Sequence, residues 1–546
     1  MQQQAVEGGS LRREMSFVDL VMACLGAIIG SGWLFGVLYA ANAAGPAAIV
    51  SSLIGGIAVI FIALVYAELS GMLPEAGGIA RYPEFTHGPL VGFVGSWGAF
   101  LAYASVPAIE AEAVVQYAEH YIPKLTGNTA LDFVIEAVLL IIFFAINVYG
   151  VKAFAKVNTV ITFLKFVAPT LTVIAFLFAV GHWSNYTATS TGGFMPEGSA
   201  GILGAVATSG IVFSYLGFRQ AVELAGESRN PQRDVPRAII TAVLLAVALY
   251  TLLQVVFIAA IPHSALAKGW AGLSLTSPFA QVASIIGLGW LAAILYADAV
   301  LSPSGTGLIY LGSTGRVVLG SARNRYLGQL FRRISDAGVP LYAMIATLVA
   351  SIIFLLPFPT WQSLVGVISS ATVFTYMMGP VSLGVLRKHY AEAHRPYRLP
   401  AASVLSPIAF VVGTLIIYWT GWATDWKLAV GLLGGVVVYL IASSAGQGVK
   451  KIDGAAIRHG AWVIVYIVAM LAMAYFGAHR FGAPFDHGKG LIHYPLDLVV
   501  DIVLALVFYY WAVASGRPST DTEEAIQRAA ELRRQTAAGG SAAMSG

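Results

Sequence analysis

A lysine stands inside a long apolar stretch of this chain, where a charge is costly. Lys165 lies in the segment TFLKFVA, and no Asp or Glu stands three or four residues from it on either side. Burial away from water disfavours an ammonium group, so such a lysine can exchange a proton when its surroundings change. The alternative is that its long side chain extends to a nearby polar boundary and stays hydrated. Lys165 is therefore a candidate for carrying a proton.

A second unusual charge, Arg219, follows the dipeptide GF in TSGIVFSYLGFRQAVELAGES. A guanidinium group presents five donors in a fixed plane and suits a carboxylate. Glu223 stands four residues further on, however, and two opposite charges at this spacing can neutralise each other on one helix face. The sequence leaves both interpretations open: Arg219 recognises a ligand carboxylate, or it pairs with Glu223.

Three acidic residues also interrupt apolar stretches, namely Glu110, Glu112 and Asp298. Ionisable groups in such surroundings are expensive and are functional candidates by default. Each of the three could carry a proton, pair with Arg219 or face a water-filled vestibule.

Two apolar segments that hold candidate residues or precede them are unusually rich in glycine. CLGAIIGSGWLFG carries Gly26, Gly30, Gly32 and Gly36, and the segment from Thr208 carries two more glycines beside serines. Glycine costs a helix interior about 1 kcal/mol relative to alanine. Such clusters predict either an interrupted helix whose bare N–H and C=O groups face a ligand, or close packing through small residues. Paired interruptions in corresponding places of two halves favour the first interpretation.

The composition places these elements in a membrane. Of 546 residues, 58% are hydrophobic and 11% are charged, whereas soluble domains contain about 25% charged residues. Cys24 is the single cysteine, which excludes an intramolecular disulfide and a multi-thiolate metal site. The histidines are scattered, GKG lacks P-loop spacing, and no nucleophile–base constellation occurs. We therefore expect no metal, no cofactor, no enzymatic activity and no nucleic-acid partner; membrane lipid surrounds the chain.

A membrane span needs about 20 apolar residues, and windows of that length predict fourteen spans. Most of the 31 lysines and arginines fall in alternate loops, which predicts that both termini are cytoplasmic. After residue 514 a capped, solvated helix and a disordered end are expected, in a tail to which no chemistry is assigned. The predicted spans are 17–41, 47–72, 91–117, 131–149, 158–180, 201–225, 238–261, 283–314, 340–357, 362–386, 403–420, 427–444, 461–478 and 496–514.

Several segments together resemble the amino acid–polyamine–organocation permeases. They are SFVDLVMACLGAIIGSGWLFG, YAELSGMLPEAGG, NVYGVKAFAKVNTVITFLK, GFRQAVELAGESRNPQRDVPRAI and RPYRLP. The resemblance implies an all-α polytopic membrane protein with the LeuT-like fold, a 5+5 inverted repeat in which helices 1 and 6 are discontinuous. Its domains would be a cytoplasmic N-terminus (1–16), a transport core (17–386, with repeats 17–180 and 201–386), spans 11–12 (403–444), two additional spans (461–514) and a cytoplasmic tail (515–546).

The resemblance also implies a substrate site at the two interruptions. A substrate carboxylate would meet the N–H groups of the first, and its ammonium would meet carbonyls of both, with Phe213 as an aromatic gate. In sodium-independent relatives a lysine at the place of Lys165 fills a sodium site and touches spans one and eight. The implied substrate-binding residues are Ile28, Ile29, Gly30, Ser31, Gly32, Phe213, Ser214 and Leu216, with Arg219 added for its charge. The coupling candidates are Lys165, Ser302, Ser304, Asp298, Glu110 and Glu112, and Thr306 offers a further hydroxyl.

These expectations describe a proton-coupled symporter that imports an amino acid. Many relatives carry an acidic or amide residue where this chain has Arg219, and the arginine suits an acidic substrate such as aspartate or glutamate. The alternatives are an antiporter or permease for neutral or cationic amino acids, with Arg219 paired to Glu223, and more remotely a nutrient sensor on a transporter fold. The sequence leaves the oligomeric state open.

Overall fold

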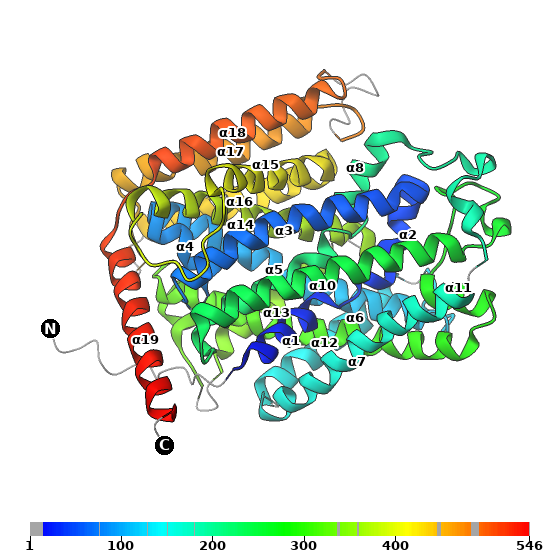
Figure 1. Cartoon of the computed structure of the whole chain (residues 1–546), viewed down its shortest axis with the longest axis horizontal. Helices are drawn as coiled ribbons and strands as arrows, with labels where there is room; N and C mark the ends of the chain where they lie inside the picture. Colours follow the sequence, from blue (N-terminus) through cyan, green and yellow to red (C-terminus); the bar gives the residue numbers. More distant parts are fainter. Residues whose placement is uncertain are drawn as a thin grey trace.

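The computed structural model describes residues 15–75, 77–127, 129–149, 151–179, 181–335, 339–356, 360–444, 449–481 and 491–544. Side chains are described in these ranges except at 149, 151–160 and 536–544. Within them the chain is helical, and its one β-type contact is an isolated bridge between Met15 and Ser228. Figure 1 shows the long helices lying side by side, most of them near the long axis of the molecule.

The principal helices agree with the predicted spans to within several residues at most ends. They are α1 (Phe17–Ile28), α2 (Gly32–Ala44), α3 (Ala48–Met72), α4 (Gly78–His87), α5 (Pro89–Ala118), α6 (Thr129–Tyr149), α7 (Val151–Ala179), α8 (Gly198–Thr208), the 3₁₀ helix η4 (Phe213–Phe218), α9 (Arg219–Glu223), α10 (Pro231–Ala260), α11 (Pro278–Ile285), α12 (Gly289–Arg323), α13 (Leu341–Leu355), α14 (Trp361–His389), α15 (Ala402–Thr420), α16 (Trp422–Ser444), α17 (Gly454–Phe476), α18 (Leu496–Ser515) and α19 (Thr520–Met544).

Among the described residues, 11 helical stretches are long and apolar enough to cross a membrane, or 12 if the bent pair at α8 and η4–α9 counts as one span. One of these stretches, Gly32–Met72, contains both α2 and α3, and Gly45 with φ +61° and Pro46 separates them. The 15-residue α13 is shorter than each of these membrane-crossing stretches. A total of fourteen spans requires α1–α2 and α3 to cross separately and α13 to cross as well, and it stays a prediction.

Both predicted interruptions are present. The first helix stops at Ile28 and resumes at Gly32, with Ile29 at φ −86°, ψ 87° outside the helical region. The second stops at Thr208, where Gly210 takes φ +91°, a conformation that side chains disfavour. The chain then continues as η4 and α9, bent by 40° from α8. The glycine clusters therefore mark broken helices.

Three helices hold the interruptions in place. α14 runs through the protein interior with its apolar window entirely buried. α5 packs against both α12 and α14, while α1 packs against α10 and η4. Polar side chains of α5 and α12 reach the first interruption, and α14 contributes one side chain to each of the two interruptions.

Two predicted boundaries are wrong. The expected span 283–314 begins instead at Gly289, because α11 ends at Ile285 and Gly287 with φ +84° turns the chain. The tail also differs, since α19 stays helical to Met544 and is not solvated on every side. Thr522 and Ala525 are buried, and Thr522 Oγ1 donates to the Phe85 carbonyl of α4 at 2.8 Å. In Figure 1, α19 lies across the end of the bundle that also holds α4.

Candidate functional site

At the N-terminus of α2, a backbone amide that has no partner within the helix donates a hydrogen bond to a carboxylate. Ser31 N donates to Glu110 Oε2 of α5 at 2.8 Å, and the Glu110 side chain is fully buried. A Cβ atom at Gly30 would lie 2.4 Å from Glu110 Oε1, so only glycine leaves room for the carboxylate there. A carboxylate at a helix N-terminus is favoured by both the free N–H groups and the helix dipole. This end of the interruption is thus an anion site, filled here by a side chain.

The C-terminal end of α1 exposes carbonyls, and donors from α7 and α12 meet them. Lys165 Nζ donates to the Gly26 carbonyl at 2.6 Å and to Thr306 Oγ1 at 2.6 Å. Ser302 Oγ donates to the Ile29 carbonyl at 3.2 Å, and Thr306 Oγ1 lies 3.1 Å from the same oxygen. The Lys165 side chain is buried, so it does not extend to a polar boundary. The structure therefore places its ammonium between the first interrupted helix and α12.

The other coupling candidates are dispersed. Asp298 on α12 is buried, lies in electrostatic contact with Lys165, and has one oxygen, Oδ2, without a hydrogen-bond partner. Glu112 forms none of the hydrogen bonds to the interruptions among the described residues; its electrostatic partners are Glu136 and other acidic groups of α5 and α6, together with Tyr39 of α2. Ser304 is half-buried and forms none of the hydrogen bonds to the interruption among the described residues. Glu112 and Ser304 thus do not hold the interruption as Glu110 and Ser302 do, since residues two positions apart on a helix point in different directions.

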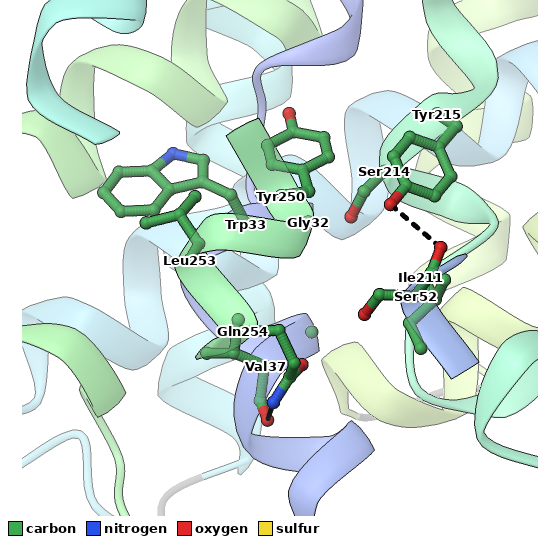
Figure 2. A pocket seen from close by; sticks show the side chains of 11 residues that line it. Gly32, Trp33, Val37, Ser52, Ile211, Ser214, Tyr215, Tyr250, Leu253 and Gln254 are labelled. Carbon is green, nitrogen blue, oxygen red and sulfur yellow. Dashed lines mark hydrogen bonds between the residues drawn. The ribbon is translucent and has the colours of Figure 1, made fainter. Parts of the chain in front are cut away.

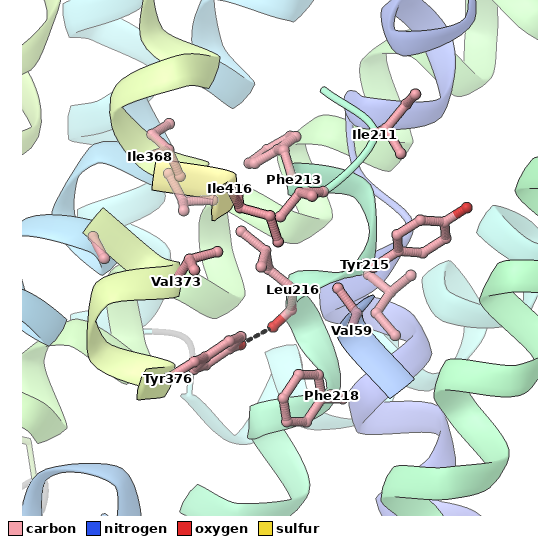
Figure 3. Close-up of a cluster of buried hydrophobic side chains, with 14 of the residues drawn as sticks. Val59, Ile211, Phe213, Tyr215, Leu216, Phe218, Ile368, Val373, Tyr376 and Ile416 are labelled. Carbon is pink, nitrogen blue, oxygen red and sulfur yellow. Dashed lines mark hydrogen bonds between the residues drawn. The ribbon is translucent and has the colours of Figure 1, made fainter. Parts of the chain in front are cut away.

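The carbonyls of the second interruption also have side-chain partners. Tyr376 of α14 donates its hydroxyl to the Leu216 carbonyl, as Figure 3 shows. Phe213 and Leu216 pack in the same apolar cluster, which Ile368 and Val373 of α14 help to build. Two of the carbonyls predicted to meet a substrate ammonium, those of Leu216 and Ile28, are therefore held by the protein in this conformation. The Ile28 carbonyl accepts from Tyr250 and from Gly30 N, each at 3.1 Å.

The two interruptions pack directly on each other. A Cβ atom at Gly217 would lie 2.4 Å from Ile28 N, and one at Gly32 would lie 2.4 Å from Ser214 Oγ. The cavity beside them measures about 20 Å³ and is bounded by Gly32, Ser214 and residues of α3 and α10 (Figure 2). That volume accommodates about one water molecule. A larger ligand needs the interrupted helices to move apart.

Gly217→Ala tests this contact. The added methyl group meets the Ile28 backbone at 2.4 Å, and overpacking of this kind costs about 1–3 kcal/mol. We expect a lower melting temperature in detergent and loss of transport. Gly320→Ala is the matched control, because nothing lies within 4 Å of a Cβ atom at Gly320 on α12. Equal behaviour of the two variants would show that the interruptions do not depend on this approach.

An aromatic layer covers the interruptions on the α2 side. Trp361 Nε1 donates to Ser31 Oγ at 2.8 Å, and its ring stacks on Tyr39 at 5.5 Å. Phe35 and Phe213 pack against the same indole, with ring centroids 5.2 and 6.0 Å away. Phe213 therefore belongs to a lid centred on Trp361. Sequence reasoning missed Trp361, because its only local signal is its place at the start of a helix capped by a threonine.

A caged guanidinium closes the other side. The Arg219 guanidinium carbon lies 3.2 Å from the centroid of the Tyr103 ring and 4.9 Å from that of Tyr310. The Arg219 side chain is fully buried, and its Nε and Nη1 atoms have no hydrogen-bond partner. Arg219 and Glu223 interact electrostatically, but no ion pair among the described residues joins them, and Glu223 Oε1 accepts from the Tyr103 hydroxyl at 3.3 Å. Tyr376 completes the cage, about four turns along α14 from Trp361.

The chain also has similarities to known proteins along most of its length. The sequence model of the amino acid permease family matches residues 15–440. This chain belongs to that family. The permease is 38% identical to the glutamate/serine transporter AimA of Bacillus subtilis (strain 168), over 98% of its own length and 99% of the relative's. It is also 38% identical to the aspartate-proton symporter of the same organism, over 93% and 98% of the two chains, and 26% identical to the branched-chain amino acid permease BcaP.

Family membership settles the class of the protein. The permease is a multi-pass, all-helical membrane transport protein and not an enzyme, which confirms the membrane class predicted from its composition and the transport function that its resemblance implied. The family model ends at residue 440, but both relatives at 38% identity extend over nearly the whole chain. The helices after α16 are therefore covered by the similarity to these two proteins.

Proposed function

We propose that this permease imports an acidic amino acid, aspartate or glutamate, together with protons across the plasma membrane. Both termini would face the cytoplasm, with the Trp361 layer outside and the Arg219 cage inside. The similarity to a glutamate/serine transporter and to an aspartate-proton symporter supports the substrate class and the coupling ion. The observation that carries the proposal is the Lys165 ammonium bound to the carbonyl end of the first interruption.

The substrate would bind by exchanging with side chains that now hold the backbone. Its α-carboxylate would replace Glu110 at Ser31 N and would also accept from the neighbouring amides of Gly32 and Gly30, the second of which now donates to the Ile28 carbonyl. Its ammonium would meet the carbonyls of Ile28 and Leu216 after the donors that now hold them move away, namely Tyr250 and the Gly30 amide at Ile28 and Tyr376 at Leu216. Phe213 would then close over the ligand with Trp361. Binding of the substrate at the anion site would therefore depend on displacement of the Glu110 side chain and on its protonation.

Three buried ionisable groups would carry the coupling. Lys165 and Asp298 lie in electrostatic contact, and Glu110 also interacts with Lys165. A charge in this interior is costly unless paired, so arrival of a substrate carboxylate favours proton uptake nearby. Displaced Glu110 would accept a proton, and Lys165 would keep or lose its own as the Gly26 carbonyl moves. Transport of the charged substrate then requires the proton.

Transport in proteoliposomes tests the proposal. We expect uptake of radiolabelled glutamate or aspartate when the lumen is alkaline relative to the bath, loss of uptake with a protonophore, and no change when choline replaces sodium. A panel of the twenty amino acids as competitors assigns the substrate. Uptake that needs sodium contradicts proton coupling, and uptake only into vesicles preloaded with an amino acid supports an antiporter. Serine as the sole competitor would contradict the acidic substrate.

A further inference from the structure

Three aspartates are buried at one end of the last helices, apart from the site described above. Asp425 lies in the first turn of α16, Asp497 in the first turn of α18, and Asp501 one turn further along α18. Asp497 and Asp501 are 0% exposed and Asp425 is 4% exposed. α15 and α17 pack against this pair of helices. The cluster therefore lies inside the protein and not on its lipid-facing surface.

Hydroxyl groups satisfy part of the cluster. Tyr418 of α15 donates to Asp497 Oδ2 at 2.7 Å, and Thr420 Oγ1 lies 2.8 Å from Asp425 Oδ1. The Thr420 hydroxyl is also 2.8 Å from that of Ser370 on α14. One chain of hydrogen bonds thus joins the cluster to the helix that holds both the Trp361 layer and Tyr376.

Asp501 differs from its neighbours because neither of its carboxylate oxygens has a hydrogen-bond partner. Asp497 Oδ1 and Asp425 Oδ2 are also unpartnered. The ordinary explanation for acidic residues at helix N-termini, stabilisation by the helix dipole, applies to the first turn and so covers Asp497 and Asp425. It does not cover Asp501, which begins the second turn.

Among the residues that the structure describes, the titratable groups that act on Asp501 are acidic or neutral. The groups in electrostatic contact with it are Asp497 on its own helix, Asp425 of α16, Tyr418 of α15 and Tyr466 of α17. α14 contributes the Ser370 hydroxyl. Among the described residues no ion pair involves the three aspartates, and no group of acidic, histidine or cysteine side chains is arranged to hold a metal ion. An isolated ionised carboxylate in an apolar interior neutralises in preference to staying charged.

We propose that Asp501, with Asp497 and Asp425, forms a proton-binding site built by the helices α15 to α18. Asp501 holds a proton in the native state, because a buried carboxyl group whose two oxygens lack hydrogen-bond partners is more stable when neutral. This site is independent of Lys165 and gives the helices after residue 440 a chemical role.

The pH dependence of stability in Asp501→Asn tests the site. A carboxyl group that is protonated when folded and ionised when unfolded makes stability fall as pH rises above the ordinary aspartate range. We expect the melting temperature of the purified full-length protein to fall from pH 5 to pH 8 less steeply in Asp501→Asn than in the wild type. The variant should be the more stable protein at pH 8, with the difference shrinking toward pH 5.

The control is Asp521→Asn on the exposed face of α19, which should keep the wild-type slope. Asp501→Val removes the same proton and should match Asp501→Asn if the amide fails to fold. Infrared spectroscopy at neutral pH should show a protonated-carboxyl band that is lost in either variant. A cation site in place of a proton site would make Asp501→Asn less stable at pH 8 and would make the wild-type melting temperature rise with added sodium or potassium. Either result, or an unchanged band, overturns the proposal.

Discussion

Lys165→Ala will leave a folded permease that equilibrates its substrate across the membrane but no longer accumulates it. Lys165 Nζ bonds the Gly26 carbonyl and Thr306 Oγ1, each at 2.6 Å. Without the ammonium, Thr306 Oγ1 still lies 3.2 Å from the Gly26 carbonyl, so the end of α1 keeps a donor. The variant loses the buried ammonium group, whose protonated and deprotonated states differ in energy and would link transport to the proton gradient. The measurement is the ratio of internal to external glutamate in proteoliposomes under an inward proton gradient.

The control for this prediction is Lys268→Ala, which removes an exposed lysine from a loop and should leave the accumulation ratio unchanged. Counterflow of labelled against unlabelled substrate, which needs no gradient, shows that Lys165→Ala still binds and moves the amino acid. Undiminished proton-driven accumulation in Lys165→Ala would assign coupling to Glu110 and Asp298 without the lysine. Loss of counterflow as well would give Lys165 a structural role at the end of α1.

The interruptions were predictable because glycine has a direct physical signature within one segment. Gly210 needs a positive φ, and Gly30 and Gly217 leave room for a carboxylate and a backbone amide. The buried charges Lys165 and Arg219 were equally visible, since a charge inside an apolar span stands out without any tertiary information. Local sequence thus marks the elements that bear the site and several of its side chains.

The partners of those residues were not predictable, because they come from helices far along the chain. Trp361, Tyr103 and Tyr310 are ordinary aromatic residues in apolar helices, and only packing brings them to Ser31 or Arg219. The same limit explains Glu112, which has the same residue type as Glu110 but faces another helix. Helical spacing separates the faces of one helix, but it does not say which face meets the interruption.

The position of Arg219 shows how this limit affects function. The sequence offered Glu223 as its partner at helical spacing, yet the Tyr103 ring lies against the guanidinium and its hydroxyl bonds Glu223. An aromatic cage stabilises a cation through its faces but leaves the N–H groups in the plane free to donate. Arg219 is therefore charged, buried and short of acceptors, which is the state expected of a group that receives a carboxylate.

Arg219→Ala should consequently weaken the binding of glutamate and aspartate far more than the binding of serine, the other substrate in the name of the glutamate/serine relative. A hydrogen bond to a charged group contributes roughly 1.5–3 kcal/mol, which corresponds to an increase of about 10- to 100-fold in the half-saturating concentration of the acidic amino acids. Serine lacks the second carboxylate and should change little. The measurement is competition by each amino acid against labelled substrate in wild-type and variant proteoliposomes.

Two variants separate this role from a purely structural one. Arg219→Lys keeps the charge within the Tyr103, Tyr310 and Tyr376 cage but loses the planar fork, so it should recover part of the glutamate affinity. Arg219→Met fills the cage without a charge and should behave like Arg219→Ala toward glutamate while protecting the melting temperature. If the binding of serine and of glutamate weakens equally in all three variants, Arg219 closes the inner side of the site and does not bind the second carboxylate of the substrate. The backbone amides at Ser31 cannot supply an acidic specificity, because they would bind the α-carboxylate that every amino acid carries. A preference for aspartate or glutamate would then have no explanation in this fold.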